Sequence, residues 1–152
     1  MDMLDLLKIL NGYQEQKKTI KLLKKENFKV VIVSNQSGIA RGYFSIKDVY
    51  KLHRYLQQEL FQFGTVVDKI YFCPFHKDGV IKKYKKKSIL RKPKIGMYLK
   101  ANKVWNIDKK KSFMIGDQKT DMEFAKRAKI KGYLFRQKNL YEFVKKKDIF
   151  NF

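Results

Sequence analysis

Residues 30–44 read VVIVSNQSGIARGYF, and this stretch decides which fold to expect. Its apolar start predicts a buried β-strand, because short runs of branched aliphatic residues favour strands. Ser34 and Asn35 follow at once, and then comes an expected loop in which Arg41 stands between two glycines. A strand that ends in a hydroxyl group and backbone N–H groups suits an anion, and phosphate is the anion that this pattern favours.

On both sides of this stretch, helical and strand patterns alternate along the chain. Ser45 and Asp48 have the spacing of a capping box, and Thr120 with Glu123 marks another helix start. The expected strands are 28–33, 69–72, 112–115 and 131–135, and the expected helices are 13–26, 45–63, 96–104, 120–129 and 140–147. Strands separated by helices predict an α/β fold with a doubly wound parallel sheet, in a single domain over residues 1–152, whose ligand site lies at the carboxyl ends of the strands.

Length and composition exclude several classes of protein. The 152 residues fit one domain, and with 44% apolar and 14% aromatic residues the chain is expected to fold. No apolar run approaches the roughly 20 residues that span a bilayer, so no membrane partner is expected. The single Cys73 excludes an internal disulfide, which favours a cytoplasmic protein.

The net charge of +22 comes mostly from lysines that are scattered along the chain. Scattered lysines are typical of a solvated surface, and they also predict nonspecific binding of polyanions at low salt. The charge alone therefore does not indicate a dedicated nucleic-acid site.

Three polar groups are expected at the carboxyl ends of strands or in the loops that leave them. They are Ser34 with Asn35, the pair Arg91 and Lys92, and Asp117. A hydroxyl group can hold phosphate oxygens, a cation can offset their charge, and a carboxylate can hold Mg²⁺. Each group taken singly is equally typical of a turn, a solvated pair of cations or a helix cap.

The order of these groups in the chain resembles haloacid dehalogenase-type phosphatases, in the branch of heptose bisphosphate phosphatase and histidinol phosphatase. Residues 30–44 resemble the second motif of that family, 91–97 (RKPKIGM) the third, and 114–122 (MIGDQKTDM) the fourth. The loop opening 73–79 (CPFHKDG) is similar to the heptose bisphosphate branch. The resemblance runs from about Leu10 to Phe135.

The resemblance assigns roles to residues of this chain. It implies that Ser34 is the phosphate-binding hydroxyl, that Lys92 clamps the phosphate and that Asp117 is a Mg²⁺ ligand. Asp121 either assists the metal or caps a helix, and Gln118 stands where relatives usually carry a basic residue. The implied substrate contacts are Asn35, Gln36, Arg41 and Arg91.

The family also holds a structural zinc ion through Cys-x-His and Cys-x-Cys pairs. Here Cys73 remains, but Phe75, Ser88 and Leu90 occupy the other three positions, and His76 is displaced by one residue. Tetrahedral zinc needs four ligands, so no structural zinc is predicted. A buried or half-buried Cys73 and a surface His76 are expected instead, with the loop either mobile or ordered by the packing of Phe75, Tyr84 and Leu90.

A second departure concerns the first motif, in which relatives have a strand that ends in Asp-x-Asp. The first Asp attacks phosphorus to form an aspartyl-phosphate, and the second is the general acid and base. Here Asp2 and Asp5 are three residues apart, whereas two carboxylates share one face of a strand only when they are two apart. The chain as given is therefore predicted to lack the nucleophile and to be inactive alone.

The strand that carries this motif lies centrally in the family's sheet, between the strands of the second and fourth motifs. Its absence leaves three alternatives: those two strands pair directly, Leu4–Leu10 substitutes for it, or the true gene product begins upstream. We expect the last. The predicted activity is hydrolysis of a phosphorylated sugar or of histidinol phosphate. The alternatives are processing of nucleic-acid ends, as in polynucleotide 3′-phosphatases, and a non-catalytic pseudophosphatase. The oligomeric state is not predicted.

Overall fold

A computed structural model describes residues 13–146, and it has the α/β architecture with parallel strands that the sequence predicts. The described residues divide into two compact units, with the boundary between Ser88 and Ile89. Each unit contains one parallel sheet of two strands.

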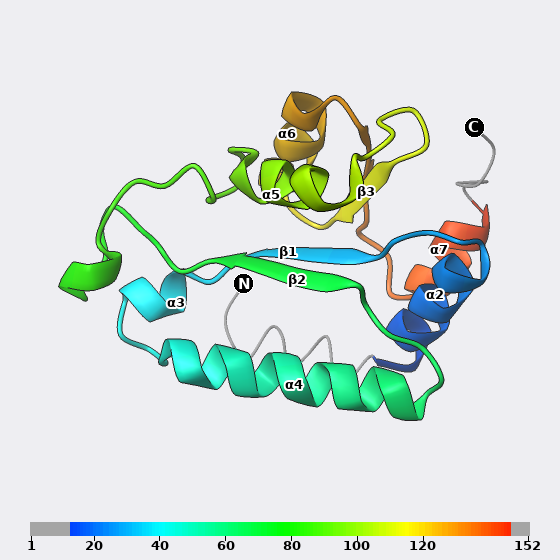
Figure 1. The fold of residues 1–152 in the computed structure, drawn as a ribbon, viewed down its shortest axis with the longest axis horizontal. Helices are drawn as coiled ribbons and strands as arrows, with labels where there is room; N and C mark the ends of the chain where they lie inside the picture. Colours follow the sequence, from blue (N-terminus) through cyan, green and yellow to red (C-terminus); the bar gives the residue numbers. More distant parts are fainter. Residues whose placement is uncertain (1–12, 147–152) are drawn as a thin grey trace. The chain divides into compact units, whose positions relative to one another are not determined.

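The first unit contains the stretch with which the sequence analysis began. β1 and β2 pair in parallel, with Ser34 opposite Phe72 and Asn35 opposite Cys73. The long helix α4 runs beside this pair of strands (Figure 1). In chain order the elements are α2 (Tyr13–Lys25), β1 (Val31–Asn35), α3 (Ser37–Ala40), α4 (Ile46–Gln62), β2 (Lys69–Cys73) and the short 3₁₀ helix η1 (Lys82–Tyr84).

β1 begins three residues later than predicted, and the residue just before it, Val30, is bonded through its backbone to Asp68, the residue just before β2. The Val30 N–H donates to the Asp68 carboxylate at 2.7 Å, and the Val30 carbonyl accepts from the Asp68 N–H at 2.8 Å. Burial alone would raise the pKa of Asp68, but the bond from Lys24, the bond from the Val30 N–H and the nearby charge of Lys29 lower it below the ordinary value. Asp68 therefore joins α2, the start of β1 and the start of β2.

The core of this unit lies between α4 and the strands. The predicted capping box is confirmed: the Asp48 N–H donates to Ser45 Oγ, and the Ser45 N–H donates to the Asp48 carboxylate. From this start α4 buries Leu56 and Leu60, which cluster with Val67 and with the half-buried side chains of Ile20, Val30, Ile32 and Ile70. The apolar spacing of the helix thus fixes which of its faces meets the strands.

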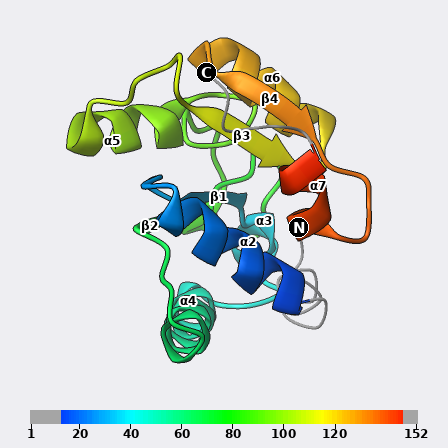
Figure 2. The same cartoon turned by 90° about the vertical axis from the view of Figure 1, so that its right-hand side faces the viewer.

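The second unit consists of a strand pair and three helices. β3 and β4 pair in parallel, with Ile115 opposite Tyr133, and α6 packs on both strands (Figure 2). Gly132 makes this close approach possible, because a side chain there would press on Ala125 of α6. The elements are α5 (Gly96–Trp105), β3 (Phe113–Gly116), α6 (Lys119–Ala128), β4 (Lys131–Leu134) and α7 (Leu140–Lys146).

The parallel α/β architecture agrees with the predicted fold class, and within residues 13–146 the strands pair as β1 with β2 and β3 with β4. Two expectations need correction. The cap of α6 is Gln118 with Asp121 rather than Thr120 with Glu123, because the Gln118 N–H donates to Asp121 Oδ2 at 3.1 Å. The expected loop after β1 contains the one-turn helix α3.

Two further expectations concern the ends of the chain and the bilayer. Leu4–Leu10, Asp2 and Asp5 lie outside the described residues. Within residues 13–146 we find no helix that is both long and apolar enough to cross a membrane.

Candidate functional site

The end of β1 presents a buried hydroxyl group with a defined partner. Ser34 and Gln36 are both buried, and Gln36 Nε2 donates to Ser34 Oγ at 2.8 Å. The Gln36 N–H continues the ladder of β1 by donating to the Cys73 carbonyl at 2.8 Å. Because one lone pair of Ser34 Oγ already accepts a bond, its own hydrogen remains available to an acceptor. Asn35, between them, is half-buried.

The segment after β1 makes a compact turn that depends on glycine at two positions, Gly38 and Gly42. A side chain at Gly38 would overlap the ring of Phe44, and Gly42 adopts φ +76°, which favours glycine. The Tyr43 N–H then donates to the Gly38 carbonyl at 2.9 Å, which closes the turn. Arg41 lies within this turn, and its side chain is exposed.

The loop from 73 to 88 is ordered partly as predicted. Cys73 is fully buried, which confirms that expectation, and the rings of Phe75 and Tyr84 are in contact with their centroids 6.1 Å apart. His76 is not the surface residue that was expected. Only 14% of its side chain is exposed, and its Nδ1 accepts a bond from the Asp78 N–H at 3.1 Å.

The third motif, in the second unit, places a cation against a carboxylate. Nζ of Lys92 lies 2.7 Å from Oδ1 of Asp121, and both side chains are buried. The contact is a buried ion pair. The Lys92–Pro93 peptide bond is cis. Arg91 is half-buried, and its carbonyl accepts a bond from the Lys94 N–H at 2.9 Å.

The fourth motif turns from β3 into α6. Gly116 permits this turn, because a Cβ atom there would overlap the side chain of Asp121. Asp117 is exposed, and its Oδ2 accepts a bond from Gln118 Nε2 at 3.2 Å. The carboxylate of Asp121 is committed to Lys92 and to the start of α6, so Asp117 is the carboxylate at this turn that remains accessible to a cation.

The residues at this turn fit a magnesium ion in part. Mg²⁺ is commonly held by one or two carboxylates together with water and phosphate oxygens, and Asp117 can supply one carboxylate. Within residues 13–146 no three His, Cys, Asp or Glu side chains are grouped so that they could hold a metal ion. The absence of structural zinc therefore stays a prediction that elemental analysis of the purified protein can test.

Within each unit, the structure joins a predicted site residue to a partner. Ser34 is joined to Gln36 in the first unit, and Lys92 is joined to Asp121 in the second. The Gln36 and Asp121 contacts were not predicted as pairs. A polar residue two positions after Ser34 was the sequence signal for the first contact, whereas the partner of Lys92 lies 29 residues away and left no local signal.

Comparison with known proteins decides the family. The chain is 42% identical to the D-glycero-beta-D-manno-heptose-1,7-bisphosphate 7-phosphatase of Rhodopseudomonas palustris over 126 aligned residues. These residues make up 83% of this chain and 70% of that protein. The chain belongs to the haloacid dehalogenase-like phosphatases. A family model described as HAD-hydrolase-like matches residues 89–139, the part that contains the third and fourth motifs. The resemblance on which the sequence analysis relied is therefore confirmed.

Other relatives of this phosphatase family match over shorter shares of their length. The enzyme of the same name from Pasteurella multocida is 46% identical over 72% of this chain and 59% of that protein. One similar solved structure is the crystal structure of D,D-heptose 1,7-bisphosphate phosphatase from B. bronchiseptica, complexed with magnesium and phosphate. Its TM-score to this chain is 0.70 and its sequence identity is 30%, and the match covers 80% of this chain and 64% of that one. A HAD-like phosphatase from Mesorhizobium loti has a TM-score of 0.73 and 33% identity over 79% of this chain and 58% of that one. The chain thus spans between about three-fifths and seven-tenths of these four relatives.

Proposed function

We propose that this chain is the phosphate-binding part of a cytoplasmic phosphatase that acts on a phosphorylated sugar, with a heptose bisphosphate as the best candidate. The names of its relatives support this substrate class. Histidinol phosphate is the second candidate from the sequence motifs, and competition between the two esters distinguishes them.

The observation that carries the proposal is the bond from Gln36 Nε2 to Ser34 Oγ. The amide group can only donate through its nitrogen, so it fixes Ser34 as an acceptor toward Gln36 and a donor in the other direction. A phosphate dianion has acceptors on every nonbridging oxygen, which is the partner that such a hydroxyl group needs. In this proposal Gln36 acts on the substrate through Ser34, whereas Asn35 and Arg41 contact it themselves.

Lys92 is proposed to offset the negative charge of the phosphate. Its ammonium group carries three N–H donors and a positive charge, which is the chemistry that binds a phosphate oxygen, and Asp121 holds it at 2.7 Å. Burial of both groups makes the ammonium position well defined, which favours electrostatic stabilisation of charge that develops in the transition state. Arg91, the residue before it, is proposed to contact a substrate phosphate.

Asp117 is proposed to hold Mg²⁺, which would neutralise and orient the phosphate when bound. In the complete reaction a carboxylate would attack phosphorus and break its bond to the sugar oxygen, which would take a proton from a general acid. Water would then hydrolyse the aspartyl-phosphate, which gives inorganic phosphate and restores the carboxylate. Asp2 and Asp5 lack the spacing for this role, so we propose that the chain as given binds phosphate and Mg²⁺ weakly and has background turnover.

Titration with inorganic phosphate, followed by ³¹P NMR, tests the binding residues. Ser34→Ala should weaken phosphate binding about tenfold, the effect of one lost hydrogen bond to a charged group. Lys92→Met should weaken it by at least as much, and Lys94→Met should leave it unchanged because Lys94 is exposed. Equal effects of Lys92→Met and Lys94→Met would contradict the proposed clamp.

Two more measurements test the substrate and the predicted inactivity. A heptose bisphosphate should displace phosphate more effectively than a single-stranded DNA end with a 3′-phosphate, with a shallow dependence on salt. A steep salt dependence with the DNA end favoured would support the nucleic-acid alternative. Phosphatase turnover by the pure chain that is abolished by Asp117→Asn would contradict the predicted inactivity.

A further inference from the structure

Three apolar side chains stand exposed together beside α3. Tyr43 is 69% exposed, Val80 is 73% exposed and Ile81 is 41% exposed. They come from two segments that are adjacent in space, because a Cβ atom at Gly42 would lie 3.5 Å from Ile81 and 3.7 Å from Val80. We call Tyr43, Val80 and Ile81 the apolar tip.

The backbone beneath the apolar tip is firmly held. The N–H groups of Val80 and Ile81 both donate to the Ala40 carbonyl, at 2.8 and 3.0 Å. Gly79 lies so close to Ala40 that a Cβ atom there would come within 2.8 Å of its carbonyl oxygen. The His76 N–H donates to the Tyr84 carbonyl at 3.2 Å and closes the loop. The two aliphatic side chains are therefore displayed to water by an ordered loop, which offers them to an apolar partner.

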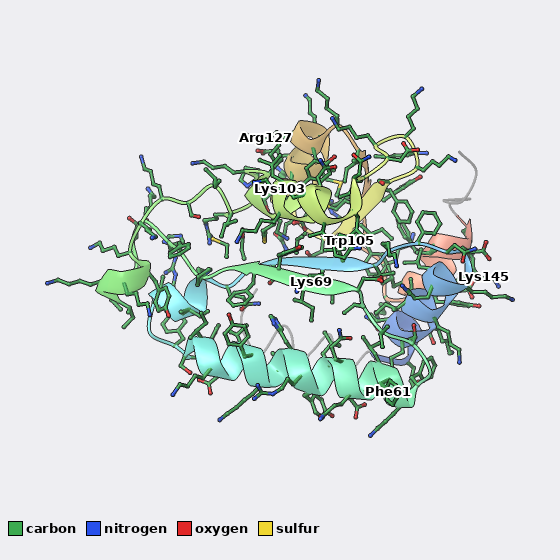
Figure 3. The ribbon with its side chains drawn as sticks, viewed as in Figure 1. Phe61, Lys69, Lys103, Trp105, Arg127 and Lys145 are labelled. Atoms are coloured by element: carbon green, nitrogen blue, oxygen red, sulfur yellow. The ribbon has the colours of Figure 1, made fainter. Side chains whose placement is uncertain are left out.

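The apolar tip has a strongly basic border. The loop 73–88 contains one acidic residue, Asp78, and side chains tipped with nitrogen project from the segment around η1 (Figure 3). Exposed cations on the loop and on the turn after α3 are Arg41, Lys77, Lys82, Lys83, Lys85, Lys86 and Lys87. A partner for this surface must combine negative charge with an apolar layer.

We propose that the apolar tip and its basic border dock on the surface of an anionic lipid bilayer. Aliphatic side chains can enter the boundary between headgroups and acyl chains, while lysines bind the lipid phosphates. This surface binding departs from the expectation of no membrane partner, which rested on the absence of a spanning segment. The docking does not require the proposed phosphatase function, although Arg41 belongs both to the basic border and to the proposed substrate contacts.

Nucleic acid fits this surface less well. Single-stranded nucleic acid binds by stacking its bases on exposed aromatic rings, which Val80 and Ile81 cannot provide. The ring of Phe75 is covered by Nζ of Lys86 at 4.4 Å from its centroid, and the ring of Tyr84 has Nζ of Lys83 at 5.6 Å. Tyr43 is the one aromatic ring of the apolar tip, whereas Val80 and Ile81 are aliphatic, and this pair favours lipid.

Co-sedimentation of the full chain with vesicles tests the docking. The vesicles contain either phosphatidylcholine alone or equal parts of phosphatidylcholine and phosphatidylglycerol, at an ionic strength of about 0.15 M, where distant charges are screened. The double variant Val80→Ser/Ile81→Ser keeps the charge, and it should weaken binding to the anionic vesicles about tenfold through lost apolar burial. Val80→Trp should strengthen binding, since tryptophan favours the interface.

The matched control is Ile89→Ser/Val104→Ser, which removes the same two residue types at 66% and 62% exposure elsewhere on the chain. It should leave vesicle binding unchanged. Equal losses for the two double variants would overturn the proposal, as would equal binding to both kinds of vesicle. A single-stranded oligonucleotide that binds the chain less well after Tyr43→Ala, but equally well after Val80→Ser/Ile81→Ser, would assign the surface to nucleic acid instead.

Discussion

Replacing Lys92 by methionine should destabilise the second unit strongly. The side chains of Lys92 and Asp121 are only 9% and 4% exposed, and Nζ lies 2.7 Å from Oδ1. Lys92→Met keeps the length of the side chain but leaves the carboxylate of Asp121 buried without its cation. Breaking a buried ion pair from one side costs about 3–5 kcal/mol, which is a large fraction of the 5–15 kcal/mol that stabilises a typical protein.

Urea unfolding measured by tryptophan fluorescence gives the magnitude directly. Trp105, at the end of α5, is the only tryptophan in the chain, so its emission reports on the unit that contains the ion pair. With a slope of about 2 kcal/mol per M urea, the midpoint should fall by about 2 M. Lys94→Met is the matched control. Because Lys94 is exposed, this substitution should change the free energy of unfolding by no more than about 0.5 kcal/mol.

A second substitution separates the charge effect from simple packing. Asp121→Asn keeps an oxygen for the Gln118 N–H but removes the charge, so adding it to Lys92→Met should restore at least about 2 kcal/mol. If Lys92→Met costs less than about 1 kcal/mol, or if the double variant loses the sum of the two single losses, the claim that this pair is a coupled buried charge is refuted.

Three further predictions concern the first unit. Burial lowers the pKa of His53, so the folded state favours its neutral form. The stability that this residue contributes should be complete above pH 6.5 and should decrease as the pH drops toward the folded-state pKa. In thermal melting, His53→Phe should therefore lose less stability on acidification than the parent chain. Lys24 and the backbone bond from Val30 lower the pKa of Asp68 despite its burial. Its contribution to stability should therefore be present above pH 3.8 and be lost as the pH falls through the folded-state pKa. Asp68→Asn should lower the free energy of unfolding, measured with urea, by about 1–2 kcal/mol at pH 7 and by little in strong acid. Gly38→Ala should cost about 1–3 kcal/mol by overlap with the Phe44 ring, and Phe44→Leu in the same chain should recover part of that loss in the same assay.

The control for Asp68→Asn comes from an exposed position. Asp78→Asn removes a carboxylate that is largely exposed, so its acid unfolding profile should match that of the parent chain. A pH profile of His53→Phe that is identical to the parent profile would show that another group produces the slope. An unchanged midpoint for Gly38→Ala would show that the turn after β1 has room for a methyl group.

Most of the secondary structure could be predicted because local signals were strong. The capping box of Ser45 and Asp48 and the apolar spacing of the following helix are properties of neighbouring residues, and both are confirmed. The parallel arrangement followed from strands that alternate with helices. These features depend on sequence distances of a few residues, which is the range in which patterns are reliable.

The errors arose where distant residues decide the conformation. Thr120 and Glu123 have acceptable cap spacing, but Asp121 accepts the Gln118 N–H through Oδ2 while its Oδ1 meets the distant Lys92, and Gln118 is the cap. His76 was expected at the surface because its zinc partners are missing, yet backbone bonds across the loop bury most of it. The helix α3 is too short to leave a periodic signal.

The same limit applies to the candidate site. Family motifs located Ser34, Lys92 and Asp117, but they could not give the partners that orient them. The bond from Gln36 to Ser34 and the pairing of Lys92 with Asp121 emerge only from the folded chain. The proposal that Ser34 and Lys92 bind the same phosphate rests on the family motifs.

Gly116 lies so close to Asp121 that the size of the residue at position 116 affects where the Asp121 carboxylate lies. A methyl group at position 116 would carry no charge, yet it would occupy the place of the Asp121 side chain and push the carboxylate away from Lys92. Glycine at position 116 thus keeps the Asp121 carboxylate next to the Lys92 ammonium group, which is proposed to bind phosphate. A substitution that looks purely steric would therefore change the affinity for an anion.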